Sequence, residues 1–124
     1  MLETKKIMIV DDEEDIRRLL KIRLEREGFE LVIAEDGEIG LRLAEAEKPD
    51  LIVLDIVMPN MDGYTCLKEL RKLPTTKDIP VIMFSGKEED KVRDLFAFQK
   101  ISAYIEKPFD LEDLINKIKE ILKV

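Results

Sequence analysis

The chain has 124 residues, of which 45% are hydrophobic and 40% charged, and its formal net charge at pH 7 is −7. This composition is typical of one globular domain that is large enough to bury a core, and it excludes a disordered chain. The negative charge argues against direct binding to nucleic acid or to an anionic membrane, and without a signal peptide or a bilayer-spanning apolar segment we expect a cytoplasmic protein.

The first part of the chain reads as two strands, each followed by a helix. Residues 6–10 form the first expected strand, and the four acids after it suit the start of a helix, where the macrodipole favours negative charge. Apolar residues then recur at helical spacing as far as Gly28, which ends that helix. Residues 31–34 form the second expected strand, and Asp36 is expected to cap a second helix that stops before Pro49.

The third expected strand, residues 51–55, holds four apolar residues followed by Asp55. Such an apolar run predicts a strand that is buried on both faces. Turn-forming residues between 56 and 63 then open a loop, and a third helix follows and ends before Pro74. A carboxylate at the end of a buried strand, opening into a loop, is better explained as a functional site than as core.

Two more strands, residues 81–84 and 103–105, enclose a segment, 92–99, in which apolar residues recur at helical spacing. Asp110 is expected to cap a final helix. Five strands therefore alternate with five helices, which is typical of an α/β fold with parallel strands and helices on both faces of the sheet. Right-handed crossovers and a doubly wound sheet follow from this alternation.

Polar residues follow four of the five expected strands, at the point where each strand ends. They are Asp11 and Asp12 after the first strand, Asp55 at the end of the third, Ser85 and Gly86 after the fourth, and Lys107 after the fifth. Ligands of doubly wound sheets bind beyond the carboxyl ends of the strands. These residues are therefore the candidate site.

The three carboxylates of this set repel one another, and such a cluster either retains protons or binds a cation. The chain has no histidine and one cysteine, so the ligands are oxygens and Mg²⁺ is the natural cation. A carboxylate beside Mg²⁺, with a lysine and a hydroxyl nearby, can receive a phosphoryl group. The cations neutralise the phosphoryl oxygens while the carboxylate attacks in line.

The same residues resemble the receiver domain of two-component response regulators. The motifs that carry the resemblance are Val10-Asp11-Asp12, Leu54-Asp55 with Met58-Pro59 and Asp62-Gly63, Phe84-Ser85-Gly86, and the stretch from Tyr104 to Phe109. They occur in the right order and spacing from about Lys6 to the end of the chain. The resemblance implies a flavodoxin-like fold with strand order 2-1-3-4-5.

The resemblance also implies a role for each residue of the site. Asp55 would be the phosphoacceptor, Mg²⁺ would be bound by Asp12, by Asp11 mainly through water, by Asp55 and by the backbone carbonyl of Val57, and Ser85, Lys107 and the Gly86 N–H would contact the phosphoryl group. Tyr104 would act with Ser85 as a switch, and the Lys107–Pro108 peptide bond would be cis. Phosphorylation would shift the surface formed by the fourth helix, fifth strand and fifth helix, which would then bind a downstream partner.

Three alternatives have weaker support. A phosphatase with an aspartate nucleophile carries a second Asp two residues after the nucleophile, where this chain has Val57, and a flavin-binding module would carry a Ser/Thr/Gly-rich loop where this chain has four acids. A pseudo-receiver that only binds proteins would not need the full set of site residues. Because Val57 is apolar and Lys87 is not a base at neutral pH, neither can orient an attacking water. We therefore expect slow self-dephosphorylation and no enzymatic turnover of an external substrate.

We expect a single receiver domain over residues 1–124, because the sequence contains no linker or internal repeat. It is a stand-alone regulator, a phosphorelay intermediate or part of a longer protein, and the start at Met1 and the short tail favour a single-domain protein. The expected partners are a sensor histidine kinase or histidine phosphotransfer protein and a downstream protein, with no direct nucleic-acid contact and no membrane insertion.

Overall fold

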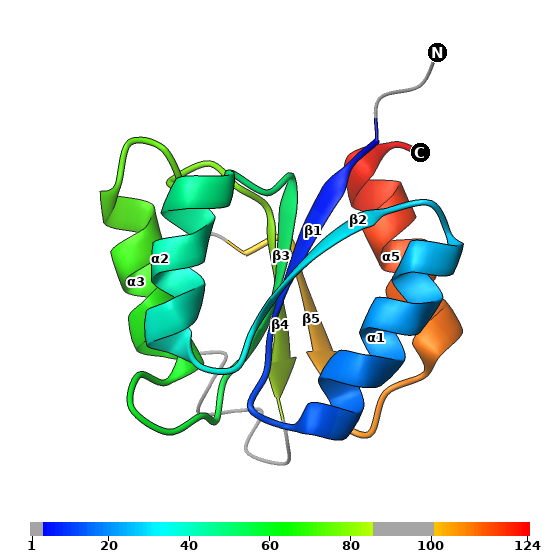
Figure 1. The fold of residues 1–124 in the computed structure, drawn as a ribbon, viewed down its shortest axis with the longest axis horizontal. Helices are drawn as coiled ribbons and strands as arrows, with labels where there is room; N and C mark the ends of the chain where they lie inside the picture. Colours follow the sequence, from blue (N-terminus) through cyan, green and yellow to red (C-terminus); the bar gives the residue numbers. More distant parts are fainter. Residues whose placement is uncertain (1–3, 86–100) are drawn as a thin grey trace.

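The computed structural model describes residues 4–85 and 101–124, which form a three-layer α/β structure (Figure 1). The strands are β1 (Lys6–Val10), β2 (Glu30–Ala34), β3 (Leu51–Asp55), β4 (Val81–Ser85) and β5 (Ala103–Glu106), and the helices of the described part are α1 (Glu14–Arg26), α2 (Gly37–Glu47), α3 (Gly63–Lys72) and α5 (Leu111–Leu122). The expected alternation of strands and helices is confirmed for these elements. The helix expected over residues 92–99 lies outside the described residues.

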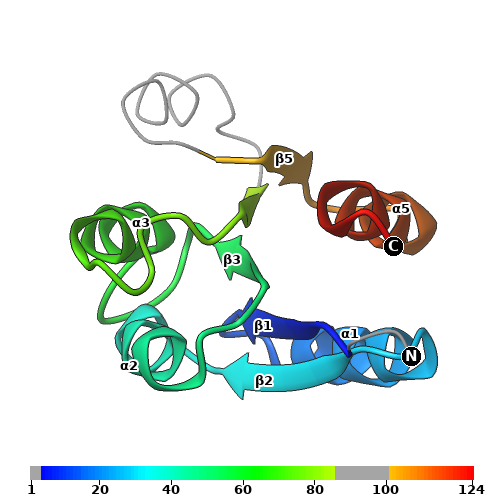
Figure 2. The same ribbon diagram turned by 90° about the horizontal axis from the view of Figure 1, so that it is seen from above.

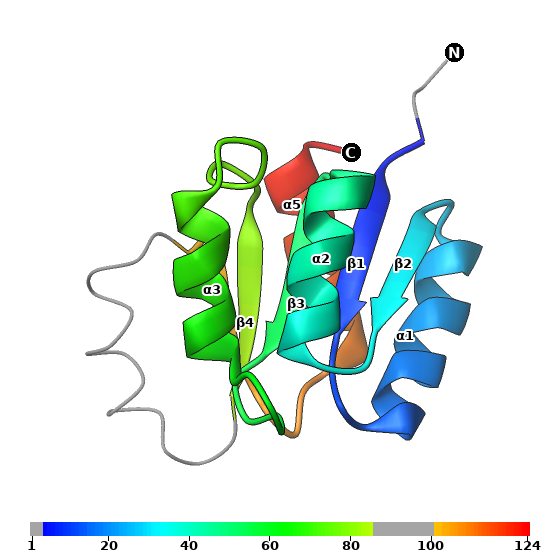
Figure 3. The same cartoon turned by 60° about the vertical axis from the view of Figure 1, so that its left-hand side comes forward.

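The five strands form one parallel sheet with the order β2-β1-β3-β4-β5, as the resemblance implied. The chain moves outward from β1 to β2 and then crosses to the other side of β1 to form β3. Ligands of such sheets bind at this reversal, beyond the carboxyl ends of the strands. Figure 3 shows the arrowheads of β1, β3 and β4 directed toward the same edge, where the loops of the site lie.

Helices cover both faces of the sheet, with α1 and α5 on one face and α2 and α3 on the other (Figure 2). Because successive residues of a strand point to opposite faces, each strand feeds two cores. In β3, Ile52 and Leu54 belong to the core under α2 and α3, whereas Leu51 and Val53 belong to the core under α1 and α5. Every residue of β3 is buried, which confirms the prediction of a strand buried on both faces.

Aspartates cap three of the helices at their N-termini. The expected caps are confirmed, because Asp36 accepts a hydrogen bond from the N–H of Ile39 at 2.9 Å and Asp110 accepts one from the first turn of α5 at 2.8 Å. Asp62 caps α3 through the N–H of Thr65 at 2.7 Å, a contact that was not predicted. No helix in the described part of the chain is long and apolar enough to cross a membrane.

The first residue of α3, Gly63, lies directly against the end of β3. A Cβ atom at Gly63 would be 2.1 Å from the carbonyl oxygen of Asp55 and 2.7 Å from the Cα atom of Ile56. The N–H of Gly63 also donates to the carbonyl of Ile56 at 2.8 Å. The loop between β3 and α3 therefore returns to the strand it left, and only glycine fits at the point of return.

Replacing Gly63 with alanine is expected to lower the free energy of unfolding by about 3 kcal/mol or more, because the added methyl group collides with backbone atoms. Gly28→Ala is the matched control. An added Cβ there would meet nothing within 4 Å, but its φ of 97° costs a non-glycine residue about 1–2 kcal/mol. Urea denaturation of both variants gives the comparison, and equal losses would contradict the steric explanation.

Candidate functional site

The carboxyl edge of the sheet brings three aspartates together. Asp11 directly follows β1 and is fully buried, and Asp55 ends β3 with 4% of its surface exposed, whereas Asp12 is exposed. Each of the three can place one carboxylate oxygen within 4.8 Å of the others. The register of β1 and β3, in which Val10 pairs with Leu54, sets this proximity. The predicted acidic cluster is therefore present in the fold.

Lys107 supplies the positive charge at the same edge. Its Nζ atom is 3.0 Å from Oδ2 of Asp11, 3.3 Å from Oδ2 of Asp55 and 3.6 Å from Oε1 of Glu13. The strand-end lysine and two of the three strand-end acids thus meet as expected. Glu13 was not predicted to take part, because its position three residues after the end of β1 suited a helix start equally well.

An aromatic pair lies beside the ammonium group of Lys107. Its Nζ atom lies 5.6 Å from the centre of the Phe84 ring, and Phe84 stacks on Phe109 with ring centres 4.9 Å apart. A cation over the face of an aromatic ring is attracted to it electrostatically. The Phe84 ring therefore favours this position of the ammonium group. The Lys107–Pro108 peptide bond is cis, as expected.

Backbone and side-chain contacts also hold Asp11 in place. Its Oδ1 atom accepts a hydrogen bond from the N–H of Glu13 at 2.9 Å, and its own N–H donates to the carbonyl of Ala34 at 3.2 Å. Arg17 donates to its carbonyl at 2.9 Å. The Arg17 contact was not predicted, because the sequence pattern places Arg17 on a helix but does not show that it reaches back to the preceding loop.

The pKa values of the buried groups reflect the crowding of charge. Burial raises the pKa of Asp55 to about 6, the charge of Asp11 adds to this shift, and Lys107 and the N–H of Val57 oppose it. Burial also raises the pKa of Asp11, against the hydrogen bond from Glu13 and the contact with Lys107. One lysine thus leaves the buried carboxylates incompletely neutralised. A set of oxygen ligands with excess negative charge fits a hard divalent cation such as Mg²⁺.

The pKa of Lys107 moves in the opposite sense to a typical buried lysine. Burial alone would lower it, but the hydrogen bond with Asp11 and the charge of Asp55 outweigh burial and raise the pKa above its usual value. Lys107 is therefore charged at any pH at which the site operates.

Two of the predicted site residues lie beside Asp55. The backbone N–H of Val57 is close enough to the Asp55 carboxylate to lower its pKa, and Val57 is 74% exposed. Ser85 is the last residue of β4 and pairs with Glu106 of β5. The structure thus brings the backbone of both positions to the carboxyl edge.

The structure describes only some of the remaining predicted positions. Tyr104 lies in β5 and packs against the core under α2 and α3, and its hydroxyl is buried with no hydrogen-bond partner among the described residues. Gly86 and Lys87 lie outside the described residues. The predicted switch surface is therefore described only for its β5 and α5 parts.

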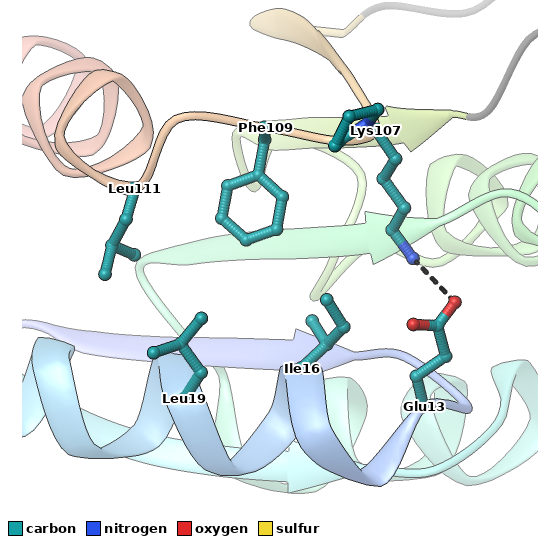
Figure 4. Close-up of a pocket in the computed structure, with 7 residues that line it drawn as sticks. Glu13, Ile16, Leu19, Lys107, Phe109 and Leu111 are labelled. Atoms are coloured by element: carbon teal, nitrogen blue, oxygen red, sulfur yellow. Dashed lines mark ion pairs between the residues drawn. The ribbon is translucent and has the colours of Figure 1, made fainter.

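An apolar hollow with a volume of about 510 Å³ lies beside Lys107, between α1 and the segment that leads into α5 (Figure 4). Its lining residues are Glu13, Ile16, Leu19, Lys107, Pro108, Phe109 and Leu111. Leu19, one of the apolar residues that recur at helical spacing before Gly28, lines this hollow and is 42% exposed, and Ile22 on the next turn is 50% exposed. The hollow was not predicted, because it depends on how α1 and the segment after β5 pack together.

Residues 7–119 match the family described as the response regulator receiver domain. The alkaline phosphatase synthesis transcriptional regulatory protein PhoP of Bacillus subtilis is 41% identical over 119 residues, which cover 96% of this chain and 49% of PhoP. RpaA of Synechocystis, a DNA-binding dual master transcriptional regulator, is 37% identical over 95% of this chain and 49% of its own length. The chain therefore spans about half the length of these relatives.

Among solved structures, a CheY-like response regulator receiver domain protein from Methanospirillum hungatei superposes with a TM-score of 0.91. The two chains are 36% identical, and the match covers 98% of this chain and 95% of the other. The similarity of the fold thus extends over almost the whole chain.

Replacing Asp55 with asparagine is expected to stabilise the metal-free protein at pH 7 by roughly 2–3 kcal/mol. The pKa of Asp55 rises from 3.8 to about 6 on folding, so the folded chain binds more protons than the unfolded chain between these values. The contribution of Asp55 to stability therefore falls as the pH rises through this range.

Urea denaturation in a chelating buffer between pH 4 and pH 7 measures this effect. The advantage of Asp55→Asn should be small near pH 4 and should grow toward pH 7. Added Mg²⁺ should stabilise the original protein more than the variant. If the variant is less stable than the original protein at pH 7 without metal, the inference that burial raises the pKa of Asp55 is contradicted.

Proposed function

The chain belongs to the response regulator receiver domain family, and from this premise we propose that Asp55 accepts a phosphoryl group from a partner's phosphohistidine in a reaction that requires Mg²⁺. The family's domains are signalling domains of two-component systems, and histidine kinases phosphorylate them. The observation that carries the proposal is the meeting of Asp11, Asp55 and Lys107 at the carboxyl edge of the sheet.

The chain's own residues divide the work of phosphoryl transfer. Asp11, Asp12, Asp55 and the carbonyl of Val57 would hold Mg²⁺, which supplies positive charge to the phosphoryl oxygens when it is bound. An oxygen of Asp55 forms the new bond to phosphorus while the bond between phosphorus and the donor nitrogen breaks. The electron pair of that bond stays on the imidazole, so Asp55 acts as a nucleophile and must be ionised.

Lys107 and the neighbouring backbone favour this ionised state. The Lys107 ammonium lies 3.3 Å from Asp55, and the N–H of Val57 also reaches the carboxylate, so both lower the pKa that burial raises. As the phosphoryl group arrives, Lys107 neutralises part of its charge. Ser85 at the end of β4 and the N–H of Gly86 would complete the contacts with the phosphoryl oxygens, as the family resemblance implies.

The phosphodonor must contact the surface around Asp55. The apolar hollow beside Lys107, with the exposed Leu19 at its rim, offers a contact surface next to the reacting atoms (Figure 4). We therefore place the contact with the donor protein over this hollow. The downstream partner would bind the surface that includes β5 and α5.

The expected absence of nucleic-acid contact finds no support in the comparisons, because RpaA is described as DNA-binding. We restrict the proposal to residues 1–124, whose net charge of −7 disfavours contact with the phosphate backbone of a nucleic acid. A cytoplasmic location is proposed on the single cysteine, Cys66, which is free and buried and thus fits a reducing compartment.

Incubation with acetyl phosphate and Mg²⁺ is expected to add one phosphoryl group to the protein, as measured by intact mass. Asp55→Asn should remain unmodified, because the amide is not a nucleophile. Asp62→Asn is the matched control, because asparagine caps a helix as well as aspartate does, and it should be modified like the original protein. Modification of Asp55→Asn, or equal modification in the presence of a chelator, would refute the proposal.

The phosphoryl group is expected to persist for minutes or longer, because the apolar Val57 cannot orient an attacking water. Val57→Glu should shorten the lifetime several-fold, and the 74% exposure of Val57 means that the substitution leaves the core intact. Val57→Ala, which is also apolar, should retain the long lifetime. The rate of dephosphorylation is measured by intact mass, as the phosphorylated species disappears after removal of acetyl phosphate. A lifetime of seconds in the original protein would contradict the expectation.

A further inference from the structure

We propose that the start of α2, through Gly37 and Asp36, positions the loop 56–62 so that the N–H of Val57 reaches the Asp55 carboxylate. This inference rests on the proposed function, since it concerns the support of the same site. It assigns a positioning role to residues that lie after β2, the strand that contributes no side chain to the acidic cluster.

The loop 56–62 is fixed to the sheet at its two ends. The N–H of Ile56 donates to the carbonyl of Phe84 at 3.0 Å, and the N–H of Gly63 donates to the carbonyl of Ile56 at 2.8 Å. Between these points Val57, Pro59 and Asn60 are exposed. Met58, next to Val57, is buried in the core under α2 and α3. The exposed stretch that follows it needs a further support if the N–H of Val57 is to stay beside the Asp55 carboxylate.

The backbone of Gly37 supplies one such support. Gly37 is buried, and a Cβ atom there would lie 2.4 Å from the carbonyl oxygen of Met61 and 3.2 Å from its Cβ atom. The N–H of Met61 in turn donates to the carbonyl of Pro59 at 2.8 Å. Any displacement of the Met61 carbonyl is therefore passed into the turn that follows Val57.

The side chain of Asp36 supplies a second support. One of its oxygens caps α2, and the other accepts a hydrogen bond from Nδ2 of Asn60 at 3.4 Å. Asn60 has a φ of 69°, a left-handed conformation that asparagine tolerates better than most residues. The cap of α2 thus also holds an exposed part of the loop.

The start of α2 is itself tied to α3, so the support is anchored on both sides. The thiol of Cys66 donates to the carbonyl of Gly37 at 3.4 Å, and Cys66 is fully buried. The loop therefore lies between two helices whose separation is set by this contact and by the packing around it. A change at Gly37 acts on the loop because α2 cannot move away freely.

A second glycine of α2 shows that small size alone does not explain Gly37. A Cβ atom at Gly40 would lie 2.9 Å from a methyl carbon of Val10, a side chain that can change its rotamer. At Gly37 the opposing atom is a backbone oxygen, which can move only with the loop. The two glycines therefore allow close approach to different partners, and only Gly37 is in contact with the loop of the site.

The test compares Gly37→Ala with Gly28→Ala, which strains the backbone far from the site. In chelating buffer, hydrogen exchange of the Val57 amide, followed by NMR, should become about tenfold faster in Gly37→Ala and should stay unchanged in Gly28→Ala. The affinity for Mg²⁺, measured by titration, should fall about tenfold in Gly37→Ala alone, as is usual when a supporting group of a metal site is lost. Unchanged Val57 exchange, or equal effects in both variants, would overturn the inference.

If Gly37→Ala does not fold, Asp36→Ser and Asn60→Gly test the second support. Serine keeps the helix cap but is too short to reach Asn60, and glycine keeps the left-handed conformation without the amide. Each should accelerate Val57 exchange by a similar factor, and the double variant should add little, since both remove the same contact. Fully additive effects would overturn the inference. If instead the original protein accepts no phosphoryl group, the proposed function is refuted but the exchange result remains valid.

Discussion

The repulsion between two buried carboxylates is the constraint on which the site depends. Asp11 and Asp55 end neighbouring strands and are almost completely removed from water, an arrangement that costs free energy unless positive charge is nearby. Lys107 contacts both acids, yet burial still raises both of their pKa values. The charge that remains uncompensated suits this edge to a hard divalent cation.

The strand order of the sheet places these acids together, and the two cores stabilise the strands that carry them. The strand order places β3 between β1 and β4, so the ends of three strands meet, and the register aligns Val10 with Leu54 and Asp55 with Phe84. Every residue of β3 is buried, so the acid at its end could move to solvent only if the strand lost its core packing. The free energy gained by burying apolar residues of β3 on both faces offsets the cost of the buried carboxyl at its end.

Regular hydrophobic patterns and turn residues made most of the fold predictable. The bounds of β1 and β3 agree with those expected, and β2, β4 and β5 are each one residue longer than expected. The acids and the lysine were predictable because the ends of parallel strands share one edge. The contacts of Glu13, Arg17 and Phe109 were not, since they depend on how helices and loops pack in three dimensions, which a period along one element does not encode.

The contact between Gly63 and the end of β3 bears on how such a domain can change during evolution. The side chains of a strand alternate between faces, so moving the acid by one position would direct it to the opposite face of the sheet. Because α3 begins against the carbonyl of Asp55, an insertion or deletion between strand and helix would also break the fit. The position of Asp55 is therefore set by the scaffold. Exposed neighbours such as Val57 can change more freely, and under the proposed function a substitution there would change the lifetime of the phosphoryl group without moving its site.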